Sequence, residues 1–270
     1  MSRHRIGFWY RLAASVVKPP LLVFFRRSWR GREHMPSAGG FITAVNHNSY
    51  LDPLSYAHFQ YSTGRVPRFL AKQSLFRGRV VGTFMRGTGQ IPVLRESSDA
   101  AGAFRAAVDA VNRGECVAFY PEGTLTRDPD LWPMEGKTGA ARVALLTGAP
   151  VIPVAQWGAH EAMPPYARTK RFRLLPRKTL TVVAGPPVDL AEFQGAEPTA
   201  DVLRQVTDRI MDAITRLLAE IRDEAPPERR LAFHPRKDAA GSSDTPDAPA
   251  TSDTTRAPQA PRAPEQERAE

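Results

Sequence analysis

The sequence has almost no cysteine, since Cys116 is the only one among 270 residues. A single thiol excludes an intramolecular disulfide framework and a metal site built from several cysteines. Cys116 lies in the apolar run Glu-Cys-Val-Ala-Phe-Tyr, which predicts a buried strand. Because burial in apolar surroundings raises the pKa of a thiol, we interpret Cys116 as an inert core residue rather than a nucleophile.

Long hydrophobic runs are also missing. The most apolar stretch, residues 12–25, would be about 21 Å long as a helix, against about 30 Å for a bilayer core. Lys18-Pro19-Pro20 interrupts it, and no Ala-x-Ala-like cleavage site follows it, which argues against a secretory signal peptide. We therefore expect a cytoplasmic-side protein that does not cross the membrane.

Acidic residues are too few to balance the basic ones. The chain has 37 Lys and Arg against 28 Asp and Glu, a net charge of +9. Residues 235–270 contain no aromatic residue and no Leu, Ile, Val or Met, and they carry a net charge of −2. We expect this segment to be a disordered tail, because it cannot bury enough apolar surface to offset its ordering entropy. Residues 1–234 therefore carry the positive charge, which favours an anionic partner such as nucleic acid, anionic lipid or a phosphorylated substrate.

The first 33 residues contain eight basic residues and one acidic residue, Glu33. On a helical wheel Trp9, Leu12 and Val16 share one stripe, and basic and polar residues occupy the opposite one. This pattern favours a helix lying on an anionic membrane surface; the alternative is a packing helix with a solvated basic face. No known nucleic-acid-binding motif is present. We therefore predict no nucleic-acid partner, and a peripheral or monotopic position at the cytoplasmic face of the cell membrane.

Strand-like and helix-like segments alternate between residues 40 and 185, and a long amphipathic helix follows. The periodicity and the turn residues predict strands over 41–45, 90–94, 115–120, 151–156 and 179–184, and helices over 53–59, 99–112, 137–147 and 200–222. This alternation predicts an α/β domain with a largely parallel sheet. We divide the chain into a membrane-associating helical segment (1–33), a folded domain (34–234) and a tail (235–270).

The first candidate motif, residues 46–52, reads Asn-His-Asn-Ser-Tyr-Leu-Asp and follows a predicted strand. His47 is suited to act as a general base oriented by Asp52. On one helix, side chains five residues apart diverge by about 140°, so the pair meets only if the loop turns back. Asp52-Pro53 permits such a turn. The plain alternative is a polar histidine at a strand end and an aspartate that caps the helix.

Three further motifs follow along the chain: Gly89-Gln-Ile-Pro-Val-Leu-Arg95, Pro121-Glu-Gly-Thr124 and Val151-Ile-Pro-Val154. Arg95 is suited to hold a phosphate with two parallel hydrogen bonds. The second of these motifs places a carboxylate, a backbone N–H and a hydroxyl at the carboxyl end of a strand, where α/β proteins bind ligands. Taken alone, each motif has an ordinary explanation: a solvated arginine, a turn and a core strand.

In this order, the four motifs resemble the PlsC-type glycerophospholipid acyltransferases, the 1-acylglycerol-3-phosphate O-acyltransferases. The resemblance covers about residues 39–157, with weaker support to residue 185. It implies a mixed sheet flanked by helices, the PlsC-like acyltransferase fold, with an N-terminal helical segment on the bilayer. It also implies His47 as the base, Asp52 as its orienting partner, and the acceptor's glycerol phosphate bound by Arg95, Glu122, Gly123 and Thr124.

The implied activity is transfer of a fatty acyl group from acyl-CoA or acyl-carrier protein to lysophosphatidic acid, which gives phosphatidic acid in phospholipid biosynthesis. The alternative acceptor is another lysolipid or a glycolipid. The tetrahedral oxyanion needs donors, for which we expect the amides of residues 46–49 or of Gly123. The basic stretch 168–178 is expected to bind the CoA phosphates or the lipid surface, or to be a solvated loop. No metal-ligand spacing and no glycine-rich nucleotide motif is present, so we expect neither a metal nor a cofactor.

The sequence departs from the family pattern at one position. The family usually has arginine directly after Glu-Gly-Thr, where this chain has Leu125. We expect Arg127 or Lys137 to supply the missing cation. The departure bears on which acceptor is bound more than on the type of reaction.

Overall fold

The computed structural model describes residues 6–93, 100–166 and 172–232, without the side chains of 100 and 101. The chain divides into two units, Met1–Phe233 and His234–Glu270, and the described residues all belong to the first. The predicted tail and Arg95 therefore lie outside the described residues.

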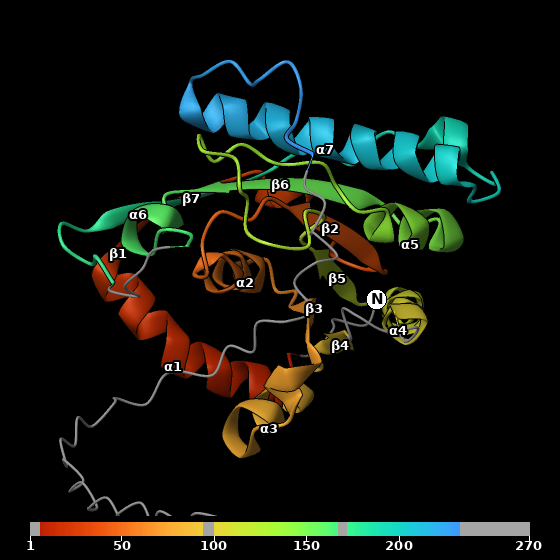
Figure 1. Ribbon diagram of the computed structural model, residues 1–270. Helices are drawn as coiled ribbons and strands as arrows, with labels where there is room; N and C mark the ends of the chain where they lie inside the picture. The colour runs from red at the N-terminus through yellow and green to blue at the C-terminus, as the bar shows by residue number, and fades with distance from the viewer. Residues whose placement is uncertain (1–5, 94–99, 167–171, 233–270) are drawn as a thin grey trace, which may run out of the picture. The chain divides into compact units, whose positions relative to one another are not determined.

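The described residues alternate between helices and strands (Figure 1). The helices are α1 (Phe8–Phe24), α2 (Asp52–Ser62), α3 (Arg79–Gly87), α4 (Ala100–Asn112), α5 (Gly139–Thr147), α6 (Ala159–Ala162) and α7 (Ala200–Arg222). The strands are β1 (Phe25–Arg30), β2 (Phe41–Val45), β3 (Pro67–Lys72), β4 (Ile91–Val93), β5 (Cys116–Phe119), β6 (Val151–Trp157) and β7 (Lys178–Ala184). Short 3₁₀ helices cover Arg32–His34, Gln73–Phe76 and Ala191–Phe193.

The strands form one seven-stranded sheet in the order β1-β7-β6-β2-β5-β3-β4. Every neighbouring pair is parallel except β6 and β7, so the prediction of a mixed, largely parallel sheet is confirmed. Strand β2 lies between β5 and β6, with Ala44 opposite Phe119 and Val45 opposite Val154. Because these strands are parallel, the loops that follow β2 and β5 leave from the same edge of the sheet.

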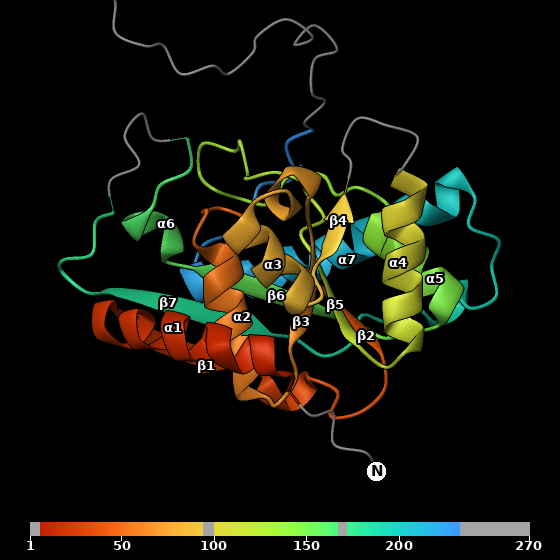
Figure 2. The same ribbon diagram turned by 90° about the horizontal axis from the view of Figure 1, so that it is seen from below.

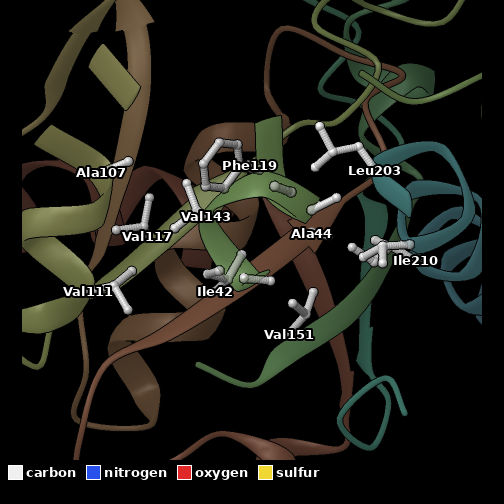
Figure 3. Packing of buried hydrophobic residues seen from close by; sticks show 14 of the residues in the cluster. Ile42, Ala44, Ala107, Val111, Val117, Phe119, Val143, Val151, Leu203 and Ile210 are labelled. Carbon is white, nitrogen blue, oxygen red and sulfur yellow. The ribbon is translucent and has the colours of Figure 1, made fainter. Parts of the chain in front are cut away.

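The two faces of the sheet have separate cores, because successive side chains of a strand point to opposite faces. Phe41 and Val45 of β2 pack with Tyr56 and Phe59 of α2. The intervening Ile42 and Ala44 pack with residues of α4, α5 and α7 (Figure 3). Figure 1 shows α2 and α7 on opposite sides of the sheet. Apolar residues thus fill both faces of β2, which explains the predicted strand over 41–45.

The N-terminal segment differs from its predicted form. Helix α1 ends at Phe24, and residues 25–30 form edge strand β1, parallel to β7, with Phe25 opposite Lys178. Within the predicted helical segment 1–33, residues 8–24 are therefore helical and residues 25–30 are not. Cys116 is buried, and burial raises the pKa of its thiol to about 12, so the interpretation as a core thiol is confirmed. No helix among the described residues is both long and apolar enough to cross a membrane.

Helix α2 is held on the sheet by its aromatic residues, and this contact can be tested. Phe59 is fully buried, whereas Leu54 on the same helix is 43% exposed. Phe59→Ala should lower the free energy of unfolding by about 3–5 kcal/mol, because it removes buried area and leaves a cavity. Leu54→Ala should lower the free energy of unfolding much less, because this side chain is already partly in water. Urea unfolding of both variants measures this difference, and equal losses would contradict the packing described.

Candidate active site

The loop after β2 begins at a buried amide pair. Asn46 Nδ2 donates to the carbonyl of Gln156 (3.0 Å), and the Gln156 N–H donates to Asn46 Oδ1 (2.7 Å). Gln156 Nε2 donates in turn to the carbonyl of Asn46 (3.0 Å). Both residues are about 1% exposed, so water competes little for these bonds. The amide pair therefore sets the direction in which the next residue, His47, leaves the sheet.

The carboxylate of Asp52 organises the loop between β2 and α2. Its Oδ2 accepts hydrogen bonds from the backbone N–H groups of Asn48 and Ser49, both at 2.7 Å, and lies 3.0 Å from His47 Nδ1. Asp52 is fully buried. A buried carboxylate is costly unless it is hydrogen-bonded, and these donors offset that cost. The loop therefore turns back as the motif requires, and His47 and Asp52 meet.

Asp52 does not cap helix α2, contrary to the plain alternative that the sequence offered. It is the first residue of α2, the N-cap position is Leu51, and no side chain caps this end. The carboxylate is instead turned toward the preceding loop. Because an ionised carboxylate only accepts hydrogen bonds, the His47 proton lies on Nδ1, and Nε2 is left to accept one. This is the tautomer that a general base requires.

Aromatic stacking also restrains the His47 ring. Its centroid lies 4.2 Å from that of Tyr120, with 27° between the rings. Tyr120 stacks in turn on Phe69 of β3, with centroids 6.0 Å apart and 6° between planes. Phe69 of β3 and Tyr120, which directly follows β5, therefore fix the orientation of the imidazole, whose side chain is 16% exposed.

Glu122 joins the His47 loop to the segment after β5. One carboxyl oxygen accepts from the His47 N–H (2.9 Å) and the other from the Met134 N–H (3.0 Å). Burial raises the pKa of this carboxyl to about 8, although the two backbone donors act in the opposite direction. The Thr126 N–H adds a bond to the His47 carbonyl (2.7 Å). Both oxygens of Glu122 are thus used by backbone, and its role in substrate binding stays a prediction.

Gly123 is required where Lys137 crosses the Glu-Gly-Thr turn. Its φ is +72°, and a Cβ at this position would lie 2.9 Å from both Cε and Nζ of Lys137. Any other residue would be strained in this conformation and would displace the lysine. The Lys137 N–H also donates to the Pro121 carbonyl (2.8 Å). One of the two expected cations therefore lies beside the turn.

The residue that replaces the family arginine is turned inward, since Leu125 is 3% exposed. Its carbonyl accepts a hydrogen bond from the hydroxyl of Tyr166 (2.8 Å), which also lies 3.4 Å from Thr124 Oγ1. The Arg127 guanidinium packs over the Tyr166 ring, 5.0 Å from its centroid. The sequence pattern missed Tyr166, which belongs to no recognisable motif. Its φ of +54°, a signal visible only in the structure, singles it out.

A cavity of about 530 Å³ borders the same segment, between residues 126–131 on one side and residues 160–166 with Arg173 on the other. Arg127, His160, Tyr166 and Arg173 are among its lining residues. Arg173 comes from the basic stretch that the sequence analysis connected with phosphate or lipid. This stretch is described only from residue 172 onward.

The amides expected to stabilise an oxyanion are already engaged. Those of Asn48 and Ser49 donate to Asp52, that of His47 donates to Glu122, and that of Gly123 donates to the Tyr120 carbonyl (2.9 Å). The choice of oxyanion donors therefore stays a prediction. In the part of the chain that the structure describes, no group of three or more His, Cys, Asp or Glu is arranged for a metal ion.

Comparisons with known proteins place the chain in a family. Residues 26–157 match the family model described as Acyltransferase. The chain is 30% identical over 165 residues to the chloroplastic 1-acyl-sn-glycerol-3-phosphate acyltransferase BAT2 of Brassica napus. The chain belongs to the PlsC-type acyltransferase family. This match covers 60% of the chain but 46% of the relative, so the chain spans less than half of that protein's length.

Other members of the PlsC-type family match over more of their length. A 1-acyl-sn-glycerol-3-phosphate acyltransferase of Bacillus subtilis is 23% identical over 211 residues, which is 77% of this chain and 96% of that protein. The crystal structure of the LPA acyltransferase PlsC from Thermotoga maritima superposes with a TM-score of 0.61 at 22% identity. The superposition covers 80% of this chain and 81% of the Thermotoga maritima chain. The predicted fold is therefore confirmed.

The buried carboxyl of Glu122 should make stability depend on pH. Because its pKa is raised from 4.5 to about 8, the folded chain keeps a proton that the unfolded chain loses. The stability from this proton is complete below about pH 4.5 and is lost as the pH rises through about 8. Glu122→Gln removes this titration. The melting temperature of the variant minus that of the wild type should therefore rise between about pH 5 and pH 8.

Glu220→Gln, at an exposed position of α7, is the matched control. Its melting temperature should follow that of the wild type at every pH. A difference between Glu122→Gln and wild type that stays constant with pH would contradict the raised pKa.

Proposed function

We propose that the protein transfers a fatty acyl group from a thioester, carried by CoA or acyl-carrier protein, to the free hydroxyl of lysophosphatidic acid. The product would be phosphatidic acid, a precursor in phospholipid biosynthesis. The observation that carries this proposal is the His47–Asp52 pair, held at 3.0 Å by a fully buried carboxylate. The relatives in Brassica napus and Bacillus subtilis are named 1-acyl-sn-glycerol-3-phosphate acyltransferases, which supports the choice of acceptor.

In the proposed reaction His47 Nε2 takes the proton of the acceptor hydroxyl as its oxygen attacks the thioester carbonyl. The new C–O bond forms, the tetrahedral intermediate collapses, the C–S bond breaks, and the imidazolium returns its proton to the departing thiolate. Asp52 stabilises the imidazolium and maintains the tautomer, as a triad aspartate does. No acyl-enzyme is needed.

The acceptor's phosphate would lie at the Glu-Gly-Thr turn. Lys137 is the cation that we assign in place of the family arginine, because its ammonium lies against Gly123. Arg127 and Arg95 would add further contacts. Arg173 lines the neighbouring cavity, which supports binding of the donor's phosphates there. Leu125, which replaces the family arginine, is the observation that favours the second candidate, another lysolipid or a glycolipid as acceptor.

Helix α1 would hold the enzyme at the cytoplasmic face of the cell membrane. Its large apolar side chains remain exposed, with Phe8 at 71%, Val16 at 66% and Val23 at 61%. Arg11 lies on the same helix, and Arg26 and Arg27 follow directly. An apolar surface beside cations is suited to an anionic lipid interface, where both the acceptor and the product reside.

The assay that tests the function uses purified full-length protein, oleoyl-CoA and a panel of lysolipid and glycolipid acceptors, analysed by mass spectrometry. Phosphatidic acid formed from lysophosphatidic acid is the expected product. His47→Ala should lower turnover by at least about 100-fold, because general base catalysis contributes about 10²–10⁴-fold. Its circular dichroism spectrum should match that of the wild type. Full activity of the variant would remove His47 from the mechanism, and acylation of another acceptor alone would overturn the proposed substrate.

Arg95 tests the assignment of the phosphate site. Losing one charge-assisted hydrogen bond should weaken acceptor binding by about 10–150-fold. Arg95→Ala should therefore raise KM for lysophosphatidic acid far more than KM for acyl-CoA. Arg95→Lys should recover part of this loss, since an ammonium lacks the planar fork of a guanidinium. Kinetics with each substrate varied separately decide the matter, and a selective effect on acyl-CoA would assign Arg95 to the donor.

A further inference from the structure

Helix α3 and the 3₁₀ helix before it expose apolar side chains. Val80 is 83% exposed, Val81 is 52% exposed and Leu75 is 46% exposed. Single exposed aliphatic residues are ordinary, but three within seven residues form a patch that packing inside this domain does not explain.

The same segment is strongly basic. Lys72, Arg77, Arg79 and Arg86 lie on it, and the sequence has no Asp or Glu anywhere between Asp52 and Glu96. Within the described ranges, none of these four cations takes part in an ion pair. Positive charge without local compensation favours an anionic partner.

Helix α3 is fastened to the start of α1. A Cβ on Gly87 would lie 2.5 Å from atoms of the Trp9 indole, so only glycine leaves room for this ring. The hydroxyl of Tyr10 donates to the carbonyl of Pro67 and accepts from Gln90 Nε2 (2.9 Å). The first turn of α1 therefore contacts both ends of the β3–α3–β4 segment.

The exposed surfaces of α1 and α3 consequently face the same surroundings. Figure 1 shows both helices on the side of the sheet opposite α7, and Figure 2 shows them from that side. Helix α1 also exposes apolar side chains, with Phe8 at 71% and Leu12 at 41%. Arg11, an exposed cation, lies on the same helix.

We propose that α3, together with residues 73–76, is a second lipid-contacting element that lies with α1 on the surface of an anionic bilayer. Val80, Val81 and Leu75 would enter the boundary between headgroups and acyl chains. Arg77 and Arg79 would bind the anionic headgroups. Charge complementarity favours an anionic bilayer as the partner, because a basic segment with no acidic residue matches a uniformly negative surface. The proposal extends the proposed function, in which α1 alone contacts the membrane.

This arrangement would also place the site beside the lipid. Strand β3, which directly precedes this element, carries Phe69, and Phe69 stacks on Tyr120, which stacks on His47. Phe69, in the strand before this element, is therefore two ring contacts from the histidine. An acceptor that remains in the bilayer would have a short path to His47.

Vesicle binding of the full-length protein tests the proposal without requiring activity. Sedimentation with vesicles of phosphatidylcholine, alone or mixed with phosphatidylglycerol, measures the partition coefficient. Each cation near an anionic surface contributes about fivefold, so Arg77→Ala/Arg79→Ala should lower binding to the mixed vesicles by roughly 30-fold. Val80→Asp should lower it as well, because a carboxylate would enter the boundary region.

Arg105→Ala/Arg216→Ala is the matched control, since it removes the same charge from exposed positions on α4 and α7. It should bind like the wild type. Equal losses in both double variants would assign the effect to net charge alone, and wild-type binding by Arg77→Ala/Arg79→Ala would leave α1 as the sole contact. Either result overturns the proposal. So would sedimentation velocity showing a dimer that Val80→Asp converts to monomer, which would make the patch an interface between copies.

An activity measurement separates this proposal from the proposed function. Arg77→Ala/Arg79→Ala should acylate a dissolved short-chain lysophosphatidic acid at the wild-type rate, and a vesicle-bound long-chain one much more slowly. Equal activity of this variant and the wild type on both forms would overturn the role of α3. A wild type inactive on both forms would overturn the proposed function and leave the binding result standing.

Discussion

The buried carboxylate of Asp52 is the contact on which the rest of the site depends. Its Oδ2 gathers the Asn48 and Ser49 amides and the His47 ring around one atom. Backbone and side chain are therefore restrained together, because each donor reduces the cost of burying the charge. A loop built in this way has little freedom to present its histidine differently. One carboxylate oxygen therefore both shapes the loop and selects the histidine tautomer.

A second buried carboxyl, that of Glu122, extends this order to the loop after β5. Its two oxygens accept from the amides of His47, 75 residues earlier in the sequence, and of Met134, and this holds the two loops together. Tyr120 adds a stacked ring directly before it. The turn that carries Gly123 and approaches Lys137 is thereby placed beside the histidine. His47, Gly123 and Lys137 are consequently held together at the edge of the sheet.

The two sides of the domain differ in a way that suits a lipid substrate. On the side of α7, the sheet is covered by a continuous apolar core. On the other side, α1 and α3 retain exposed apolar side chains among uncompensated cations. Burying those side chains within the chain would have added stability, since each large aliphatic residue contributes about 1.5–3 kcal/mol when fully buried. Their exposure fits a protein that completes this side by contact with a bilayer.

The sequence by itself determined the elements with strong local signals and the chemistry of the His-x-x-x-x-Asp motif. Strand 41–45 and helix 200–222 follow their predicted bounds, because apolar periodicity is a local property. Only the tertiary structure decided that the charged segment Phe25–Arg30 is a strand, since its pairing partner β7 lies about 150 residues away. Asp52 accepts from residues only three to five positions away, but only the three-dimensional course of the loop shows that it does so instead of capping the helix. The positions of Lys137 against Gly123 and of Tyr166 beneath Arg127 were likewise decided by the tertiary structure. These two contacts join separate segments of the chain, which no local pattern records.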